Sequence, residues 1–177
     1  YLCADPLRVL GTRHWQGGLS LIEAIDTPVR PSGRDRASEG PERADLESLV
    51  RRLDLVGHCD LPCFVDNPYA FMRRARLFVL SSAWEGLPGV LIQAMACGTP
   101  VLSTDCPSGP REILDDGRLG ALVPVTDPEA LAQAMIHTLL ETPDRAALRA
   151  RAKDYSLDRV VRDYLGYLGM GPGTRST

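Results

Sequence analysis

Residues 81–98, SSAWEGLPGVLIQAMACG, have the residue types and the spacing of an anion-binding loop. An apolar run predicts a strand that ends at Ser81 or Ser82, and Pro88 opens a predicted helix that stops at Gly98. The start of a helix carries free backbone amides and the positive end of the helix dipole. Because this start would lie at the carboxyl edge of a parallel sheet, we expect a phosphate to bind there without basic side chains.

The expected phosphate contacts are the backbone amides of Gly89, Val90 and Leu91. Glu85 precedes this helix and Gln93 comes eight residues later, so both can reach one extended ligand. A carboxylate beside a phosphate is electrostatically unfavourable, so a functional Glu85 would bind hydroxyl groups. The alternative is a plain strand-to-helix turn in which Glu85 caps backbone amides, and the spacing alone favours neither reading.

Cysteine and histidine do not form a site that the spacing would predict. The five cysteines are an odd number with neither a disulfide framework nor paired zinc-knuckle spacing, so reduced thiols are expected. No metal site is expected, because the group of His58, Cys59 and Cys63 lacks a fourth ligand. Cys97 and Cys106 have no base near them in sequence and are read as small buried side chains.

Short apolar runs alternate with amphipathic segments, as in the βαβ units of a parallel sheet. Strands are expected within residues 7–11, 76–82, 100–104 and 121–125. Helices are expected within residues 19–25, 41–55 and 127–141, the last with Asp127 as its N-cap. A final helix from Leu157 to Leu168 has one apolar stripe that needs a partner surface. The pattern predicts an α/β fold with a Rossmann-like, doubly wound parallel sheet.

Two segments do not fit this order. Residues 27–40, TPVRPSGRDRASEG, are too polar for a buried strand, although the βαβα order places a strand there. Either this segment is a long loop or the sheet lacks one strand. Residues 59–64, CDLPCF, contain Pro62, which removes a donor from a strand ladder and fits only an edge or a bulge.

The composition is that of one globular domain, with 177 residues of which 44% are hydrophobic. We expect this domain to span residues 1–168 and to be followed by a disordered tail at 169–177. A net charge of −3 opposes a broad nucleic-acid surface. No apolar run of transmembrane length and no signal peptide is recognisable, so a cytoplasmic protein is expected.

Residues 85–101 resemble the signature of the group 1 family of retaining glycosyltransferases with the GT-B fold. The family pattern runs E-G-x-P/G-x-x-x-x-E-A-M/L-A-x-G-T-P-V-V-x-T/S. Nine identities carry the resemblance: Glu85, Gly86, Ala94, Met95, Ala96, Gly98, Thr99, Pro100 and Val101. DCPSGPREIL at 105–114 resembles a subgroup that acts on hexoses and N-acetylhexosamines, and most of residues 40–168 look like family counterparts.

The resemblance implies the carboxyl-terminal domain of a two-domain enzyme, which holds a nucleotide-diphospho-sugar donor. Such an enzyme transfers a hexosyl or N-acetylhexosaminyl group, with retention, to an acceptor glycan or lipid-linked sugar, and it requires no metal or other cofactor. The acceptor-binding amino-terminal domain is expected outside this chain. Any membrane association would then be peripheral, at the inner membrane face.

The resemblance also implies roles for single residues. Glu85, the candidate catalytic residue, would bind hydroxyls of the donor sugar. The loop and helix amides would hold the diphosphate, from Gly86 and Leu87 through Gly89, Val90 and Leu91. Gln93 replaces the second acid of the family and would bind the ribose hydroxyls as a neutral partner. The base of the donor nucleotide, for which uracil is favoured, would lie against backbone near Phe64, Val65 and Asn67.

The cationic positions of the family are lost. Residues 11–25, GTRHWQGGLSLIEAI, resemble G-R-x-x-x-x-K-G-x-x-L-I-E-A, but Thr12 and Gly17 stand in place of the arginine and lysine. Arg13 lies one residue away and is the remaining candidate for a phosphate contact, although neighbours on a strand point to opposite faces. His14, near the expected diphosphate loop, is read as an inert surface residue and Trp84 as a packing residue.

Three functions compete on these observations. The first is the donor-binding domain of a glycosyltransferase. The second is a truncated or degenerate, non-catalytic remnant that binds a nucleotide or a partner protein weakly, which Gln93, Thr12 and Gly17 favour. The third is an epimerase or phosphorylase relative on the same fold, but the segment from EGLPG to GTPVL fits the transferases better.

Overall fold

The computed structural model describes residues 9–13, 19–23, 43–61 and 67–170 of the chain. Within these residues, a mixed sheet has the strand order β3-β1-β2-β4-β5-β6. The strands are β1 (Val9–Arg13), β2 (Leu19–Glu23), β3 (Cys59–Asp60), β4 (Leu77–Leu80), β5 (Val101–Thr104) and β6 (Ala121–Val123). Pairing is parallel along β4-β5-β6 and between β1 and β3. β2 is antiparallel to both of its neighbours.

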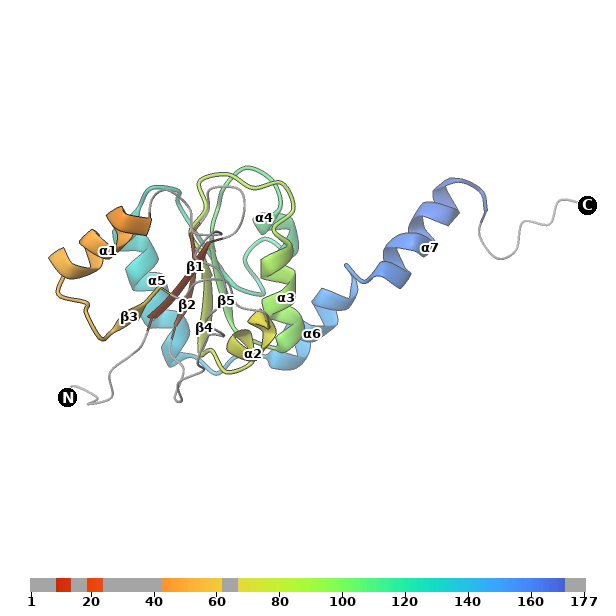
Figure 1. Ribbon diagram of the computed structural model, residues 1–177. Helices are drawn as coiled ribbons and strands as arrows, with labels where there is room; N and C mark the ends of the chain where they lie inside the picture. The colour runs from red at the N-terminus through yellow and green to blue at the C-terminus, as the bar shows by residue number, and fades with distance from the viewer. Residues whose placement is uncertain (1–8, 14–18, 24–42, 62–66, 171–177) are drawn as a thin grey trace, which may run out of the picture.

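Strand β4 is buried on both faces, which explains its uninterrupted apolar sequence. Because successive side chains of a strand point to opposite faces, Phe78 and Leu80 join one apolar cluster and Leu77 and Val79 join the other. Helices cover both clusters (Figure 1). The α/β class and the doubly wound arrangement are therefore confirmed.

The larger cluster lies under four helices, namely α2 (Pro68–Met72), α3 (Gly89–Cys97), α4 (Pro110–Ile113) and α6 (Arg145–Lys153). Leu91 and Met95 of α3 and Ile113 of α4 are fully buried in it. The predicted helix start at Pro88 is confirmed, since Pro88 is the N-cap of α3, and Gly98 ends the helix with a left-handed φ of 77°.

Helix α5 (Pro128–Leu140) covers the smaller cluster on the other face. Its apolar side was predicted from the sequence and does pack there, with Leu131, Ala134, Met135 and Leu139 against the strands. The Asp127 side chain caps the helix by accepting from the Ala130 amide at 2.9 Å.

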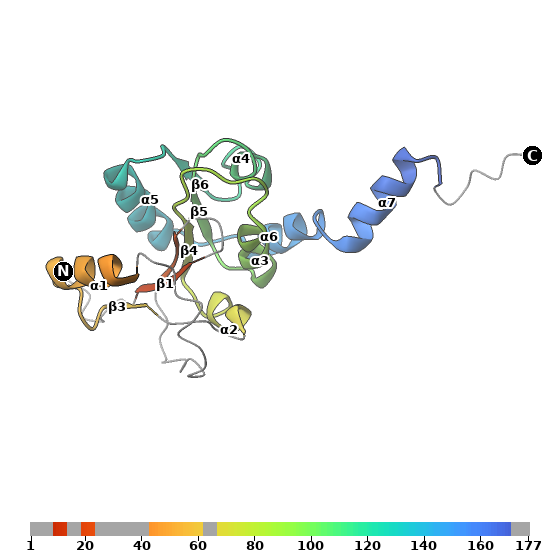
Figure 2. The same ribbon diagram turned by 45° about the horizontal axis from the view of Figure 1, so that its top comes forward.

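Helices α1 (Arg43–Arg52) and α7 (Leu157–Tyr167) bury none of their apolar side chains fully. Leu53, just after α1, is 57% exposed. Helix α7 extends away from the sheet and the other helices in both views (Figures 1 and 2). Its predicted stripe exists but is uncovered, with Leu157 76% and Tyr164 67% exposed. None of the helices in the described ranges is long and apolar enough to cross a membrane.

The helix predicted within residues 19–25 is wrong, since Leu19–Glu23 form strand β2. β2 pairs with β1 on one side and with β4 on the other, so tertiary pairing overrides a short pattern that fits either period. The edge position predicted for residues 59–64 is confirmed for β3, although Pro62 lies outside the described residues. The polar segment 27–40 lies outside them too, and the proposed domain and tail boundaries stay predictions.

Candidate functional site

Helix α3 is the first element after strand β4 in the chain, and it starts at the carboxyl edge of the parallel strands. The helix has no side-chain cap. The Leu91 amide donates to the Pro88 carbonyl at 2.9 Å, whereas the amides of Gly89 and Val90 have no acceptor within the described part of the chain. A Cβ added at Gly89 would meet no atom within 4 Å, so a ligand can approach this backbone. An uncapped helix start of this kind favours an anion.

Glu85 lies beside this helix start and is half-buried. Its Oε1 accepts a hydrogen bond from Ser82 Oγ at 2.7 Å, and it does not cap α3, so the structural alternative considered for this residue is not observed. Trp84 and Leu87 flank it with exposed fractions of 62% and 59%. The packing role expected for Trp84 is therefore wrong within the described part of the structure, where its side chain is mostly exposed.

The Glu85 loop, residues 81–88 between β4 and α3, is held in place by the loop after strand β5. Ser108 Oγ donates to the Glu85 carbonyl at 3.0 Å. Gly109, with a φ of 79°, lies so close that an added Cβ would be 2.4 Å from the Gly86 carbonyl oxygen and 2.5 Å from Pro88 Cδ. Only glycine fits this contact and this backbone conformation. Sequence reasoning noted the segment PSGP but gave no role to these two residues.

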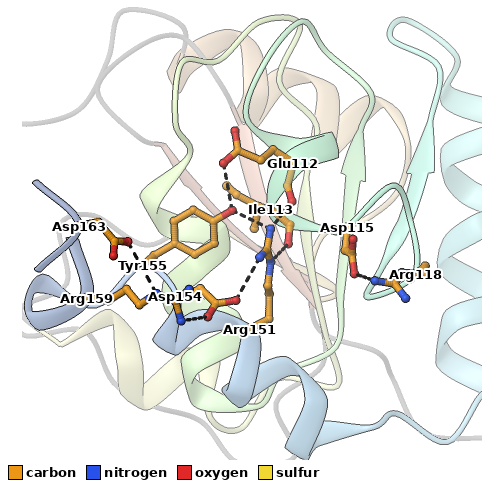
Figure 3. A network of polar contacts seen from close by, with 9 residues as sticks. All are labelled: Glu112, Ile113, Asp115, Arg118, Arg151, Asp154, Tyr155, Arg159 and Asp163. Carbon is orange, nitrogen blue, oxygen red and sulfur yellow. Dashed lines mark hydrogen bonds and ion pairs between the residues drawn. The ribbon is translucent and has the colours of Figure 1, made fainter. Parts of the chain in front are cut away.

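Arg151 of α6 anchors the helix that follows this loop (Figure 3). Its guanidinium donates to the carbonyls of Glu112 at 2.7 Å and Ile113 at 3.2 Å, at the carboxyl end of α4. It also pairs with Asp154 at 3.1 Å and lies over the Tyr155 ring. These contacts of Arg151 attach α4 to α6. They therefore also restrain the turn at Ser108 and Gly109, which directly precedes α4.

Two ionisable side chains near the site, Arg111 and Cys106, have pKa values raised by their surroundings. Arg111 is paired with Asp105 and Asp116, and its hydrogen bond to Asp105 raises its pKa. Its charge is therefore already compensated by carboxylates. Burial, and to a lesser extent the charge of Glu85, raises the pKa of the Cys106 thiol, which is 2% exposed. The reading of Cys106 as a small apolar side chain is confirmed. Cys97 is half-buried, and burial raises its pKa as well.

The other predicted site residues differ in where they lie. Gln93 follows Gly89 by four residues and so occupies the same face of α3 one turn along. Arg13 is the last residue of β1, and β2 lies between β1 and β4 in the sheet. The backbone of Arg13 therefore lies at the same edge of the sheet as the end of β4, two strand spacings or about 10 Å from it. Asn67 caps α2 by accepting from the Ala70 amide. The far end of that helix packs by the carboxyl end of α3, through the bond from Thr99 to the Met72 carbonyl. Phe64 and Val65, like His14 and Gly17, lie outside the described residues.

No group of three or more His, Cys, Asp or Glu side chains that could hold a metal ion occurs in the described ranges. Around the start of α3, the described residues offer backbone amides, the Glu85 carboxylate and hydroxyl groups. These groups suit a phosphorylated ligand that carries sugar hydroxyls.

The family model for glycosyl transferases group 1 matches residues 17–155, which include the whole Glu85 loop and α3. The chain belongs to this family. This glycosyltransferase domain is 34% identical over 134 residues to a Campylobacter jejuni enzyme, "N-acetylgalactosamine-N,N'-diacetylbacillosaminyl-diphospho-undecaprenol 4-alpha-N-acetylgalactosaminyltransferase". The match covers 73% of the chain and 37% of that enzyme, so the domain spans a little over a third of its relative.

Solved structures show the same fold for this glycosyltransferase domain. Sucrose-phosphate synthase from Thermosynechococcus elongatus superposes with a TM-score of 0.60 at 29% identity, over 77% of this chain and 36% of that one. HepE from Anabaena, in complex with UDP, gives a TM-score of 0.63 at 22% identity, over 71% of this chain and 36% of that one. The matches are to transferases, which disfavours the epimerase or phosphorylase alternative.

Proposed function

We propose that this domain binds a nucleotide-diphospho-sugar, with UDP as the carrier, for retaining transfer of a hexosyl or N-acetylhexosaminyl group. The observation that carries the proposal is the uncapped start of α3 with the Glu85 carboxylate beside it, at the carboxyl edge of the sheet. The Campylobacter relative is named for the transfer of an N-acetylgalactosaminyl group, and HepE was solved with UDP; both support the choice of donor.

The diphosphate would lie over the helix start. The amides of Gly89 and Val90 are available to it, whereas that of Leu91 is already bonded to Pro88. Gly86 and Leu87 would approach the ligand from the loop, since a Cβ added at Gly86 meets no atom and Leu87 is exposed. Arg13 is the remaining cation that we propose for the diphosphate, in place of the family's positions at Thr12 and Gly17.

The sugar and the nucleoside would extend in two directions from the diphosphate. Oε1 of Glu85 is bound by Ser82, which leaves Oε2 to accept from donor-sugar hydroxyls. Gln93 would bind the ribose, and Phe64 and Val65 the uracil. The backbone near Asn67 would join this base site, while the Asn67 side chain caps α2. The departing diphosphate would take the acceptor proton, so the domain contributes positioning and electrostatic stabilisation.

Acceptor binding belongs, in this proposal, to the part of the protein that the chain does not cover. The acceptor would be a glycan or a lipid-linked sugar, as the undecaprenol in the name of the Campylobacter enzyme suggests. The domain would act in the cytoplasm or peripherally at the inner membrane face. The chain alone should therefore bind the donor and transfer no sugar.

Calorimetric titration with UDP and with a panel of UDP-sugars tests the proposal. Glu85→Ala should weaken UDP-sugar binding by about 1.5 to 3 kcal/mol, roughly ten- to a hundredfold, and leave UDP binding unchanged. Glu129→Ala, an exposed acid on α5 over the other face of the sheet, is the matched control and should change neither affinity. Equal losses for both ligands in Glu85→Ala would remove Glu85 from the sugar site. No binding of any nucleotide by the natural chain would favour the non-catalytic remnant.

A further inference from the structure

We propose that Ser82 is a positioning residue that holds the Glu85 carboxylate in place for the donor sugar, and that Thr104 holds Ser82 from the neighbouring strand. This inference rests on the proposed function of Glu85. It concerns hydroxyl groups that are buried beneath the loop and that a ligand would not touch.

The first link is the Ser82 side chain, which is only 1% exposed. Its Oγ donates to Glu85 Oε1 at 2.7 Å, a short bond to a carboxylate. A buried hydroxyl without a partner is costly, so this bond is retained whenever the loop is folded. The bond fixes a long side chain that would otherwise sample several rotamers. It also decides which carboxylate oxygen faces the open side of the loop.

The second link crosses from β5 to the end of β4. Thr104 is 4% exposed, and its Oγ1 donates to the Ser82 carbonyl at 2.5 Å and lies 3.3 Å from the Leu80 carbonyl. The parallel register, with Leu80 opposite Ser103, brings the end of β5 beside the end of β4. The backbone at Ser82 is thereby tied to the sheet at the point where the chain leaves it.

A third contact holds the main chain of the same glutamate. Ser108 donates to the Glu85 carbonyl at 3.0 Å, and Gly109 packs on the carbonyl of Gly86. Glu85 is therefore restrained at its carboxylate by Ser82, two residues after β4, and at its backbone by the loop after β5. Among the described residues, none donates a hydrogen bond to Oε2, so this oxygen is open to a ligand and its direction is set before the ligand arrives. Such preorganisation increases affinity by lowering the entropy lost on binding.

A purely structural role for Ser82 predicts different behaviour. If Ser82 only stabilised the loop, its loss would weaken UDP and UDP-sugar binding alike and would add to the effect of Glu85→Ala. If Ser82 acts through the carboxylate, its loss should affect only the part of the affinity that the sugar contributes. The two losses should then not be additive, because Glu85→Ala removes the group that Ser82 orients.

The experiment is a double-mutant cycle of Ser82→Ala and Glu85→Ala in this chain, titrated with UDP, UDP-glucose and UDP-N-acetylgalactosamine. Ser82→Ala should weaken UDP-sugar binding about three- to tenfold, leave UDP binding unchanged, and have no further effect in the Glu85→Ala background. Thr104→Val should weaken UDP-sugar binding by a smaller factor and leave UDP binding unchanged. Thr104→Ser keeps the hydroxyl and should bind UDP-sugars as tightly as the unsubstituted chain. Ser103→Ala is the matched control, because Ser103 is equally buried on β5 but its hydroxyl donates to the Thr104 carbonyl.

Additive losses, an equal loss for UDP, or the same loss in Ser103→Ala would overturn the proposal. A crystal structure of the Ser82→Ala variant separates this failure from failure of the proposed function. The Glu85 carboxylate should have moved in that structure, and a carboxylate that keeps its place refutes the positioning role whether or not the chain binds a nucleotide. A displaced carboxylate in a chain that binds no UDP-sugar would support the positioning role and reject the function.

Discussion

The contact of Gly109 with the Glu85 loop gives a prediction that joins stability to ligand binding. In Gly109→Ala, the new Cβ would lie 2.4 Å from the Gly86 carbonyl oxygen. An ordinary contact is about 3.4 Å, so the loop must retreat by about 1 Å. The φ of 79° adds strain of about 1 to 3 kcal/mol for a residue other than glycine. With the displaced contact, we expect a loss of about 2 to 4 kcal/mol in the free energy of unfolding.

For a domain of this size, such a loss lowers Tm by about 5 to 15 °C. A shift of about 1 Å at Gly86 and Pro88 should also weaken UDP binding, by about tenfold or more. Thermal unfolding followed by circular dichroism and calorimetric titration with UDP measure the two effects. Gly117→Ala is the control, because Gly117 has a φ of 89° but its nearest atom to an added Cβ is 3.9 Å away. It should show the strain alone and bind UDP normally. If both variants lose the same Tm and both bind UDP like the natural chain, the contact does not position the loop.

Three further predictions test other parts of the structure. Gln93→Glu should tighten binding of free uridine about fivefold, since a charged acceptor is worth about 1 kcal/mol more and uridine lacks the repelling phosphates; no response in titrations with uridine and UDP would remove Gln93 from the ribose site. Met95→Ala should lower the free energy of unfolding by about 2 to 5 kcal/mol in a thermal or urea assay, because Met95 is fully buried. Met170→Ala is the control and should leave the free energy of unfolding unchanged, because the Met170 side chain is 67% exposed. Equal Tm values for the two variants would contradict the assignment of α3 to the core. Burial raises the pKa of the Cys106 thiol, so this thiol keeps its proton in the folded chain at a pH where it ionises in the unfolded chain. Its contribution to the free energy of unfolding is therefore complete below about pH 9 and is lost as the pH rises further. The natural chain should therefore lose stability more steeply above about pH 9 than Cys106→Ala, and parallel curves of unfolding free energy against pH would show that the thiol is not shielded.

Elements with a complete local signal could be predicted from the sequence. Helix α5 has an apolar face at helical spacing and Asp127 as its cap, and β4 is a continuous apolar run of strand length. β5 starts directly after Pro100 with two apolar residues, Val101 and Leu102. Residues 19–23 have no such signal. Five residues are too few to separate the two periods, and the pairing partners that decide the outcome lie elsewhere in the chain. Helix α6 was missed because its apolar residues are four alanines and one leucine among four basic residues, and only Leu148 and Ala152 are buried.

The candidate site divides in the same way. Glu85 and the helix start could be predicted because they are neighbours in sequence, where a loop and a helix amino terminus are recognisable. The support beneath them could not. Thr104 reaches Ser82 only through the β4–β5 register, and Ser108 reaches Glu85 only through the fold of two loops. In the sequence, nothing distinguishes these hydroxyl residues from other serines and threonines at strand ends and turns, because their partners are set by the pairing of the strands.

The unequal helix layers on the two faces of the sheet imply an order in which the domain opens. Helix α3 buries Val90, Leu91, Ala94 and Met95, whereas α5 has only half-buried or exposed side chains. Backbone amides exchange with solvent through local opening, and segments with fewer buried contacts open at lower free energy. Amide protons of α5 should therefore exchange with deuterium well before those of α3. The helix whose amino terminus we propose for the donor diphosphate would then belong to the most slowly exchanging unit of the domain.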